Sequence, residues 1–284
     1  MSENIIFRRP FASFFALTLL TFAINIPIVV THGFPGRFEG LDSMNIERVD
    51  YRDHICLLDG AEKWDATKCA IRHGAGHGVL VWGDSYAAHY VEALGRDLPR
   101  IRGDLLQYTR AACPPILSST ARTDERCTDF NQHVFEVIAQ NKIDFVVLAG
   151  RWEAHFKGQK IGLSDLTDTI SRLKALGVQV LVIGQSPVFS FQHPEEYFYR
   201  SKSLGAVRGG YRAPVDLRES LNQKIEESVR QGGGRFFDPS KIFCEGQLCL
   251  YKLNDKYLVA DNGHLTKTGS EMVIEKMLQS SAFE

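Results

Sequence analysis

The sequence has no excess of charge of either sign. Lysine and arginine number 33 against 34 aspartates and glutamates, which leaves a formal net charge of -1 over 284 residues. Proteins that hold nucleic acid through its phosphates carry a clear excess of positive charge, so no nucleic-acid partner is expected. The six cysteines include no Cys-x-x-Cys pair, and a structural zinc site is therefore not expected either. We expect neither a metal nor another cofactor.

Long hydrophobic runs are also scarce, and the one clear case lies near the amino terminus. From Phe11 to Val30 the chain has 20 residues without a charge, enough to cross a bilayer core of roughly 30 Å. Arg8 and Arg9 precede it, which favours a cytoplasmic tail at 1–10 and export of the remainder. A signal peptide cleaved after Ala23 is the alternative, but it would leave an apolar stub. We therefore expect a single-pass anchor at 11–30 in the inner, cytoplasmic membrane, with the rest in the periplasm.

The six cysteines fall into pairs that are close in sequence. An exported domain folds in an oxidising compartment, where such pairs form disulfides. Six cysteines allow many connectivities, so the pairing is predicted from proximity alone. Buried free thiols of a cytosolic protein are the alternative, which the hydrophobic run argues against. The predicted disulfides are Cys56–Cys69, Cys113–Cys127 and Cys244–Cys249.

After the hydrophobic run, the chain turns to an alternation of strand and helix patterns. Residues 31–75 are expected to form a linker and a disulfide-closed segment, and 76–284 the main domain. Apolar runs rich in β-branched residues predict strands at 79–82, 105–108, 143–149, 178–183 and 235–237, with helical patterns between them. Such alternation produces right-handed crossovers and a parallel sheet covered on both faces. The expected fold is a three-layer α/β/α sandwich, flavodoxin-like, around a five-stranded parallel sheet.

A serine follows the first predicted strand directly. The apolar run ends in Gly83-Asp84-Ser85 and passes at once into a helical pattern, which would expose the Ser85 hydroxyl at the edge of the sheet. Ligands of parallel sheets bind outside the carboxyl ends of the strands, and the loops that begin at Gly150 and Gly184 share that edge. On its own, however, Ser85 is better explained as the N-cap of a helix.

Asp261 and His264 could supply what a serine nucleophile needs. Their spacing on a turn lets the carboxylate hold one ring nitrogen of the histidine and leaves the other free to take the serine proton. The alternative for this loop is that it caps the last helix through Thr266. Combined with a Gly-Asp-Ser turn after the first strand, the pair indicates a Ser-His-Asp triad. His89, one helical turn after Ser85, is expected to be buried or solvated rather than active.

The order of these motifs resembles that of the SGNH hydrolase family. The closer resemblance is to the exported SGNH domain of membrane O-acyltransferases that modify bacterial polysaccharides. Besides the serine turn and the Asp-x-x-His loop, it rests on Cys113-Pro114-Pro115, the runs 147–152 and 182–187, and His264-Leu265-Thr266 with Gly269. It covers about residues 76 to 280. The resemblance implies the α/β/α sandwich, with Ser85 as nucleophile, His264 as base and Asp261 as the group that orients it.

The sequence departs from the general family pattern where the oxyanion should be bound. The family has Gly-x-Asn-Asp after the third strand, but Trp152 stands here in place of the asparagine. No glycine follows the second strand, where Ala112 and Cys113 lie. The remaining candidates for oxyanion or substrate contacts are the Ser85 N–H together with Asp84, Ala112, Gly150, Arg151 and Trp152.

Two of these candidates have competing interpretations. The Arg151 guanidinium could donate to the oxyanion, or it could form a salt bridge with Asp84 or Glu153. Trp152 could stack on a sugar ring, or it could pack at the rim of the site. Loss of one oxyanion donor typically lowers the rate of an enzyme by roughly a hundred- to a thousandfold.

The sequence as a whole predicts an enzyme that forms an acyl-Ser85 intermediate. It would pass the acyl group, expected to be acetyl, to a carbohydrate hydroxyl or to water, so its partner is a carbohydrate acceptor or an acylated glycan of the cell envelope. No multi-span domain of the kind that delivers the acyl donor in fused relatives is found, so a separate membrane protein is expected to supply it. The altered oxyanion loop supports one alternative, a non-catalytic carbohydrate-binding or assembly protein on the same scaffold.

Overall fold

The chain forms two separate units in the computed structural model, which describes residues 8–30, 46–72, 78–97, 103–117, 124–158, 161–201, 210–215 and 219–280. The division falls between Asn45 and Ile46. In the first unit, helix α1 (Arg8–Val30) covers the predicted membrane span. Across the residues described, no helix is both long and apolar enough to cross a bilayer. The structure therefore does not support the predicted anchor, which stays a prediction from the sequence.

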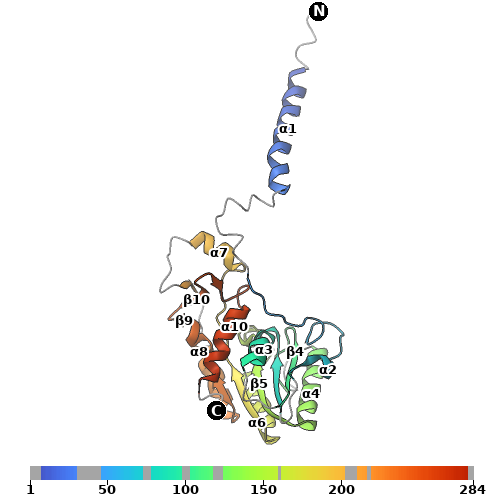
Figure 1. Ribbon diagram of the computed structural model, residues 1–284, viewed down its shortest axis with the longest axis vertical. Coiled ribbons are helices and arrows are strands. Elements are labelled where there is room, and N and C mark those ends of the chain that lie inside the picture. The colour runs from blue at the N-terminus through green and yellow to red at the C-terminus, as the bar shows by residue number, and fades with distance from the viewer. Residues whose placement is uncertain are drawn as a thin grey trace, which may run out of the picture. The chain divides into compact units, whose positions relative to one another are not determined.

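A seven-stranded sheet forms the centre of the second unit (Figure 1). Five of its strands are the predicted ones: β3 (Gly78–Gly83), β4 (Leu105–Arg110), β5 (Ile143–Ala149), β6 (Gln179–Ile183) and β8 (Arg235–Phe237). They are parallel and lie in the order β4-β3-β5-β6-β8. This is the flavodoxin-like order, in which the chain runs from β3 to one neighbour and then to the other. The two connections that leave β3 and β4 in opposite directions open a crevice at the carboxyl ends of these strands.

The prediction of a purely parallel, five-stranded sheet is wrong at one edge. Strand β1 (Leu57–Leu58) extends the sheet in parallel beside β4, and β2 (Ala70–Arg72) pairs with β4 in the antiparallel direction. Both strands are too short to produce a strand pattern in the sequence. The disulfide Cys56–Cys69 holds them together through the loop and the short helix α2 (Ala66–Cys69) between them. The segment from residue 46 to 72 is therefore part of the same unit as the main domain.

Helices cover both faces of the sheet. On one face lie α4 (Glu125–Gln140), α6 (Leu163–Ala175) and α8 (Glu219–Gln231), whose apolar side chains share one core with Leu80, Val146 and Val182 of the strands. On the other face, α3 (Ser85–Asp97) and α10 (Lys267–Leu278) lie side by side (Figure 1). The predicted three-layer arrangement is confirmed, and it leaves the carboxyl ends of the strands as the open edge.

A second, smaller sheet was not predicted. Strands β7 (Gly210–Pro214), β9 (Cys244–Glu245), β10 (Leu248–Leu253) and β11 (Lys256–Tyr257) pair in the antiparallel direction. The chain reaches them through α7 (Pro194–Ser201) and α9 (Ser240–Phe243). In this sheet the buried ammonium group of Lys252 lies 4.4 Å from the ring centre of Phe198, with two tyrosine rings within 5.5 Å. This sheet leads directly into the loop that carries Asp261 and His264.

All three predicted disulfides are present. Cys56–Cys69, Cys113–Cys127 and Cys244–Cys249 are bonded, so no cysteine is free in the part of the chain described. Each closes a short loop and restricts the unfolded chain, which contributes roughly 2–4 kcal/mol to stability under oxidising conditions. Three disulfides and no thiol fit an oxidising compartment outside the cytoplasm.

Candidate active site

Ser85 stands at the point where strand β3 turns into helix α3. The turn depends on Gly83, because a Cβ atom there would clash with the carbonyl oxygen of Ala149 at the end of β5. The strands β3 and β5 therefore approach closely just before the serine. Ser85 is the first residue of α3, so its hydroxyl lies at the positive end of the helix, where developing negative charge is stabilised.

Ser85, His264 and Asp261 form one continuous hydrogen-bonded chain. The Ser85 Oγ lies 2.8 Å from Nε2 of His264, across 179 positions in the sequence. The other ring nitrogen of His264, Nδ1, lies 2.7 Å from Oδ2 of Asp261. A histidine held in this way presents an unprotonated Nε2 to the serine, as a general base must.

The loop that carries the acid and the base is closed on itself. Val259 and Leu265 form an antiparallel bridge across it, and the Ala260 N–H donates to the carbonyl oxygen of His264 at 2.8 Å. Inside this loop, Oδ1 of Asp261 accepts from the backbone N–H groups of Gly263 and His264 at 2.9 and 2.8 Å. The carboxylate is therefore fixed by the backbone as well as by the imidazole.

These bonds keep Asp261 ionised. Burial alone would raise the pKa of its carboxyl group. The hydrogen bonds and positive charge of His264, together with the two backbone N–H groups, outweigh burial and lower that pKa to about 2. A permanent carboxylate beside Nδ1 favours the tautomer in which that nitrogen carries the proton.

Asp84, next to the serine, has a different role from the expected substrate contact. Its side chain is buried and accepts three hydrogen bonds: Oδ1 from the Tyr86 N–H at 2.7 Å, and Oδ2 from the Arg151 N–H at 2.9 Å and from the His155 ring at 2.7 Å. It therefore joins the serine turn to the loop that follows β5. With its lone pairs used in this way, Asp84 positions the site from below rather than facing a substrate.

His155 is a buried partner of the site that the sequence did not suggest. It lies on α5 (Trp152–Lys157), and its Nε2 is the ring atom bonded to Asp84. The available signal is weak: the only hint is a histidine at helical spacing after Arg151. Because a histidine in a helix is common, this hint alone would not have distinguished it.

The chain can now be compared with known proteins. Residues 52–279 match the sequence model of a family described as the SGNH domain fused to AT3 domains. The chain belongs to the SGNH family. No curated protein sequence matches it significantly.

Solved structures show the same fold for this SGNH domain. The periplasmic domain of a lipopolysaccharide acetyltransferase from Salmonella ser. Paratyphi A is 21% identical, with a TM-score of 0.58 over 74% of this chain and 85% of that one. A carbohydrate acetylesterase from Sinorhizobium meliloti, Est24, is 12% identical, with a TM-score of 0.45 over 72% of this chain and 97% of that one. A mutant of the Geobacillus acetyl-xylooligosaccharide esterase Axe2 is 15% identical, with a TM-score of 0.43 over 72% and 94%.

Trp152 does not occupy the position expected of an oxyanion or substrate contact in this SGNH domain. Its side chain is fully buried, with 0% exposed, and its indole N–H donates to the carbonyl oxygen of Ile183 at 2.8 Å. The expected stacking on a sugar and the expected packing at the rim are both wrong. The reason is the start of α5 at this residue, which turns the indole under the sheet edge toward β6.

Arg151 forms no salt bridge with either acid that was considered. Asp84 pairs with His155, and Glu153 lies 3.9 Å from Lys157 instead. The Arg151 guanidinium lies 5.9 Å from the centre of the Tyr86 ring, and its buried Nε has no hydrogen-bond partner among the described residues. A cation without an ion partner thus lies beside the triad.

Ala112 takes a backbone conformation that glycine adopts more easily. It follows β4 with a φ of 56°, in the left-handed region, where the general SGNH pattern has a glycine. Gly150 follows β5, and a Cβ atom there would lie 3.6 Å from both Asp84 and Pro115. Both positions flank the end of β3, because β4 and β5 are its neighbours in the sheet. Their backbone N–H groups are thus candidates for the oxyanion, together with that of Ser85.

Three rings surround His264 from different parts of the chain. Tyr86 and Tyr51 have ring centres 4.7 and 5.9 Å from that of the imidazole. Burial raises the pKa of both phenols, so each stays protonated. His89 is fully buried, with Nδ1 accepting from the Leu265 N–H at 3.3 Å, and burial lowers its pKa well below the usual value. Tyr51 comes from the segment before the main domain, a contribution that was not predicted.

One group of side chains elsewhere has the spacing of metal ligands. His54, Asp59 and Glu62 bring one ligand atom each to within 4.8 Å of one another. His54 and Asp59 are exposed and bonded to each other at 2.9 Å, and the charge of Asp59 raises the pKa of the imidazole. An ion pair explains this grouping without a metal ion.

Proposed function

We propose that this SGNH domain is a serine acyltransferase or esterase that acts on carbohydrate. The observation that supports it best is the chain of short hydrogen bonds from Ser85 through His264 to Asp261. The family and the fold support the same reaction type, since the Salmonella relative is a lipopolysaccharide acetyltransferase domain. The sequence alternative, a non-catalytic binder, is disfavoured by this geometry, because a binding protein has no need of an aligned base.

The reaction proposed has two halves that use the same base. His264 takes the proton of Ser85 as the Oγ attacks the carbonyl carbon of the acyl donor, and the oxygen of the leaving group receives that proton when the tetrahedral intermediate collapses. In the second half, His264 takes a proton from a carbohydrate hydroxyl or from water, and the new ester or acid forms as Ser85 is released with its proton. Backbone N–H groups at Ser85, Ala112 or Gly150, together with Arg151, would stabilise the oxyanion.

We further propose that the domain works outside the cytoplasm beside a membrane partner. The three disulfides fit that compartment, and the relative of known structure is described as a periplasmic domain. Because the family is described as fused to AT3 domains, a membrane protein of that kind is the proposed source of the acyl group. A single anchor at 11–30 would hold the domain at the same membrane.

Formation of an acyl-enzyme tests this function directly. The full chain is mixed with p-nitrophenyl acetate, quenched in acid, and searched by mass spectrometry for acetyl on the peptide that contains Ser85. Ser85→Ala should abolish both the adduct and turnover. Ser171→Ala, which removes an exposed serine hydroxyl on α6, is the matched control and should change neither. Undiminished hydrolysis in Ser85→Ala, or carbohydrate binding without turnover of any ester, would reject the enzyme in favour of the binder.

A further inference from the structure

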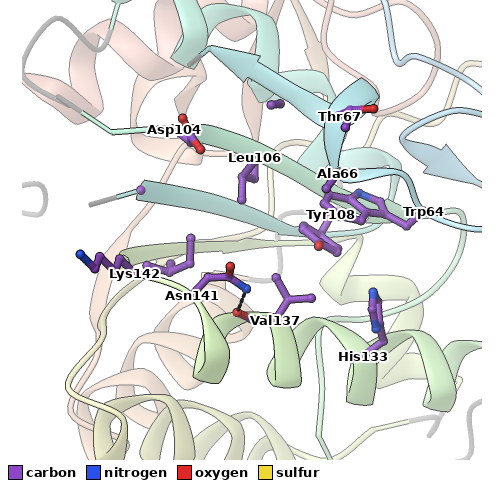
Figure 2. Close-up of a pocket in the computed structure, with 13 residues that line it drawn as sticks. Trp64, Ala66, Thr67, Asp104, Leu106, Tyr108, His133, Val137, Asn141 and Lys142 are labelled. Carbon is purple, nitrogen blue, oxygen red and sulfur yellow. Dashed lines mark hydrogen bonds between the residues drawn. The ribbon is translucent and has the colours of Figure 1, made fainter. Parts of the chain in front are cut away.

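A groove of about 560 Å³ lies away from the triad, between β4, helix α4 and the segment around α2 (Figure 2). Its lining includes Gly78, Asp104 and Ile143, which lie at or next to the amino-terminal ends of β3, β4 and β5. Ser85 follows the opposite, carboxyl end of β3. The groove is therefore separate from the proposed active site, and its size is that of an ordinary small-molecule site.

A rigid pair of aromatic rings forms one wall of the groove. Trp64 and Tyr108 stack with ring centres 3.5 Å apart and planes inclined by 20°. The indole N–H of Trp64 donates to the carbonyl oxygen of Gln107 at 2.7 Å, which fixes the ring in place. Trp64 is still partly exposed, although it is anchored on a buried partner. An aromatic surface held in this way loses little entropy when a ligand packs on it.

The same wall carries a polar group without a partner. Tyr108 is fully buried, and its hydroxyl has no hydrogen-bond partner among the described residues. Figure 2 shows its ring in the space between β4 and α4, on the side that His133 and Val137 face. Burial raises the pKa of this phenol, so it remains a donor. Such an unsatisfied buried hydroxyl typically costs about 1–3 kcal/mol, which a ligand oxygen could recover.

The rim of the groove is polar but carries no net charge. His133, Asn141 and Lys142 are exposed, and Asp104 contributes one carboxylate against the one ammonium of Lys142. The side-chain N–H of Asn141 donates to the carbonyl oxygen of Val137 at 2.7 Å (Figure 2), so its oxygen is the part that can accept from a ligand. A balanced rim of this kind favours neither an anion such as phosphate nor a cation.

We propose that this groove binds a sugar residue of a neutral glycan chain, as a second carbohydrate site remote from Ser85. Pyranose rings match the lining, because their C–H faces pack on aromatic rings while their hydroxyls both donate and accept. The inference rests on the proposed function, since it assumes that the substrate is a carbohydrate. A chain held here has its other residues at raised local concentration near the triad, so the site favours polymers over single sugars.

Binding of neutral tetrasaccharides to the full chain tests the site. Xylotetraose, cellotetraose and maltotetraose are titrated to tens of millimolar while the indole N–H signal of Trp64 and the ring signals of His133 are followed by NMR. We expect at least one of them to shift both sets of signals. Inorganic phosphate is the charged comparison and should leave them unchanged. Failure of all three sugars, or a response to phosphate alone, would overturn the proposal.

Variants locate the binding and separate this site from the triad. His133→Ala and Trp64→Ala should each weaken tetrasaccharide binding by about tenfold or more, and Trp64→Phe, which keeps a ring, should weaken it less. His133 is exposed, so its variant tests the site even if Trp64→Ala fails to fold. Unchanged binding in His133→Ala and in any Trp64 variant that folds would place the sugar elsewhere and overturn the inference.

Hydrolysis of p-nitrophenyl acetate by the same samples reports on the proposed function independently. It should be unchanged in His133→Ala, because this small ester does not reach the groove. Turnover of the ester without any sugar binding would remove only the second site. Sugar binding without ester turnover would remove only the proposed enzyme.

Discussion

Two aspartate–histidine pairs of equal length serve the serine turn, and they differ in burial and in the ring nitrogen they use. In both pairs a ring nitrogen lies 2.7 Å from a carboxylate oxygen. The Asp261 and His264 side chains are 32% and 24% exposed, whereas those of Asp84 and His155 are 2% and 4% exposed. His264 bonds the acid through Nδ1 and keeps Nε2 for Ser85, while His155 spends its Nε2 on Asp84. An Asp–His pair is thus suited to act as a base only when its second nitrogen is both free and accessible.

The largest expected difference between the pairs is in turnover. Asp261→Asn should lower kcat for a small ester by about 10⁴-fold, because the asparagine no longer holds the proton on Nδ1 of His264. Asp84→Asn keeps most of its hydrogen bonds and should lower kcat by about tenfold. Steady-state hydrolysis of p-nitrophenyl acetate by the two full-chain variants gives the comparison. Equal losses would mean that Asp84 takes part in the chemistry as directly as Asp261 does.

Stability should show the opposite ranking. His155→Ala leaves the Asp84 carboxylate buried without its partner, which should lower the free energy of unfolding by about 3–5 kcal/mol. His264→Ala breaks a partly exposed pair and should cost less than about 1 kcal/mol. Urea denaturation followed by tryptophan fluorescence measures both. A greater loss in His264→Ala would show that the two pairs do not divide as burial predicts.

The pH dependence of stability should identify the exposed pair. The pKa of Asp261 is about 2 in the folded protein, against roughly 4 for an unfolded aspartate. The contribution of this carboxylate is therefore present above pH 4 and is lost as the pH falls toward 2. After allowance for solvent screening of a side chain about one-third exposed, the loss should be about 1–2 kcal/mol. Unfolding at pH 5 and near pH 2 should show this extra loss in the wild type and not in Asp261→Asn.

The smallest expected effect lies outside both pairs, at Ala112. Ala112→Gly relieves a left-handed backbone that is unfavourable for alanine by roughly 1–2 kcal/mol, at the cost of a more flexible unfolded chain. We expect the free energy of unfolding to rise by about 0.5 kcal/mol. Ala111→Gly, with no positive φ to relieve, is the matched control and should lower it. A loss in Ala112→Gly as large as in the control would mean that the strain at Ala112 is negligible.

The sequence was sufficient for the parts of the site that follow from topology. Parallel strands place their carboxyl ends at one edge, so a serine after β3 and a polar loop late in the chain could be expected to meet there. The two residues are 179 positions apart and still lie within hydrogen-bonding distance. Strand order and the helix layers were likewise predictable, because both depend on hydrophobic patterns longer than four residues.

The contacts that escaped prediction depend on side-chain direction or on very short elements. The indole of Trp152 turns toward Ile183 because α5 begins at that residue, which no periodicity reveals. His155 reaches Asp84 for the same reason. Tyr51 lies beside His264 because its segment is fixed next to β4: the side-chain amide of Gln107 donates to its carbonyl oxygen at 3.0 Å. Bonds of this kind leave no pattern in a sequence.

The bridge between Val259 and Leu265 gives the acid and the base a history different from that of the serine. The loop it closes is short, so its conformational entropy cost is small and Asp261 can find His264 without the rest of the domain. Ser85 joins them only when strands far apart in the chain have paired. Enzymatic turnover is therefore a reporter of complete folding, whereas the ionisation of Asp261 can persist in a chain whose sheet has come apart.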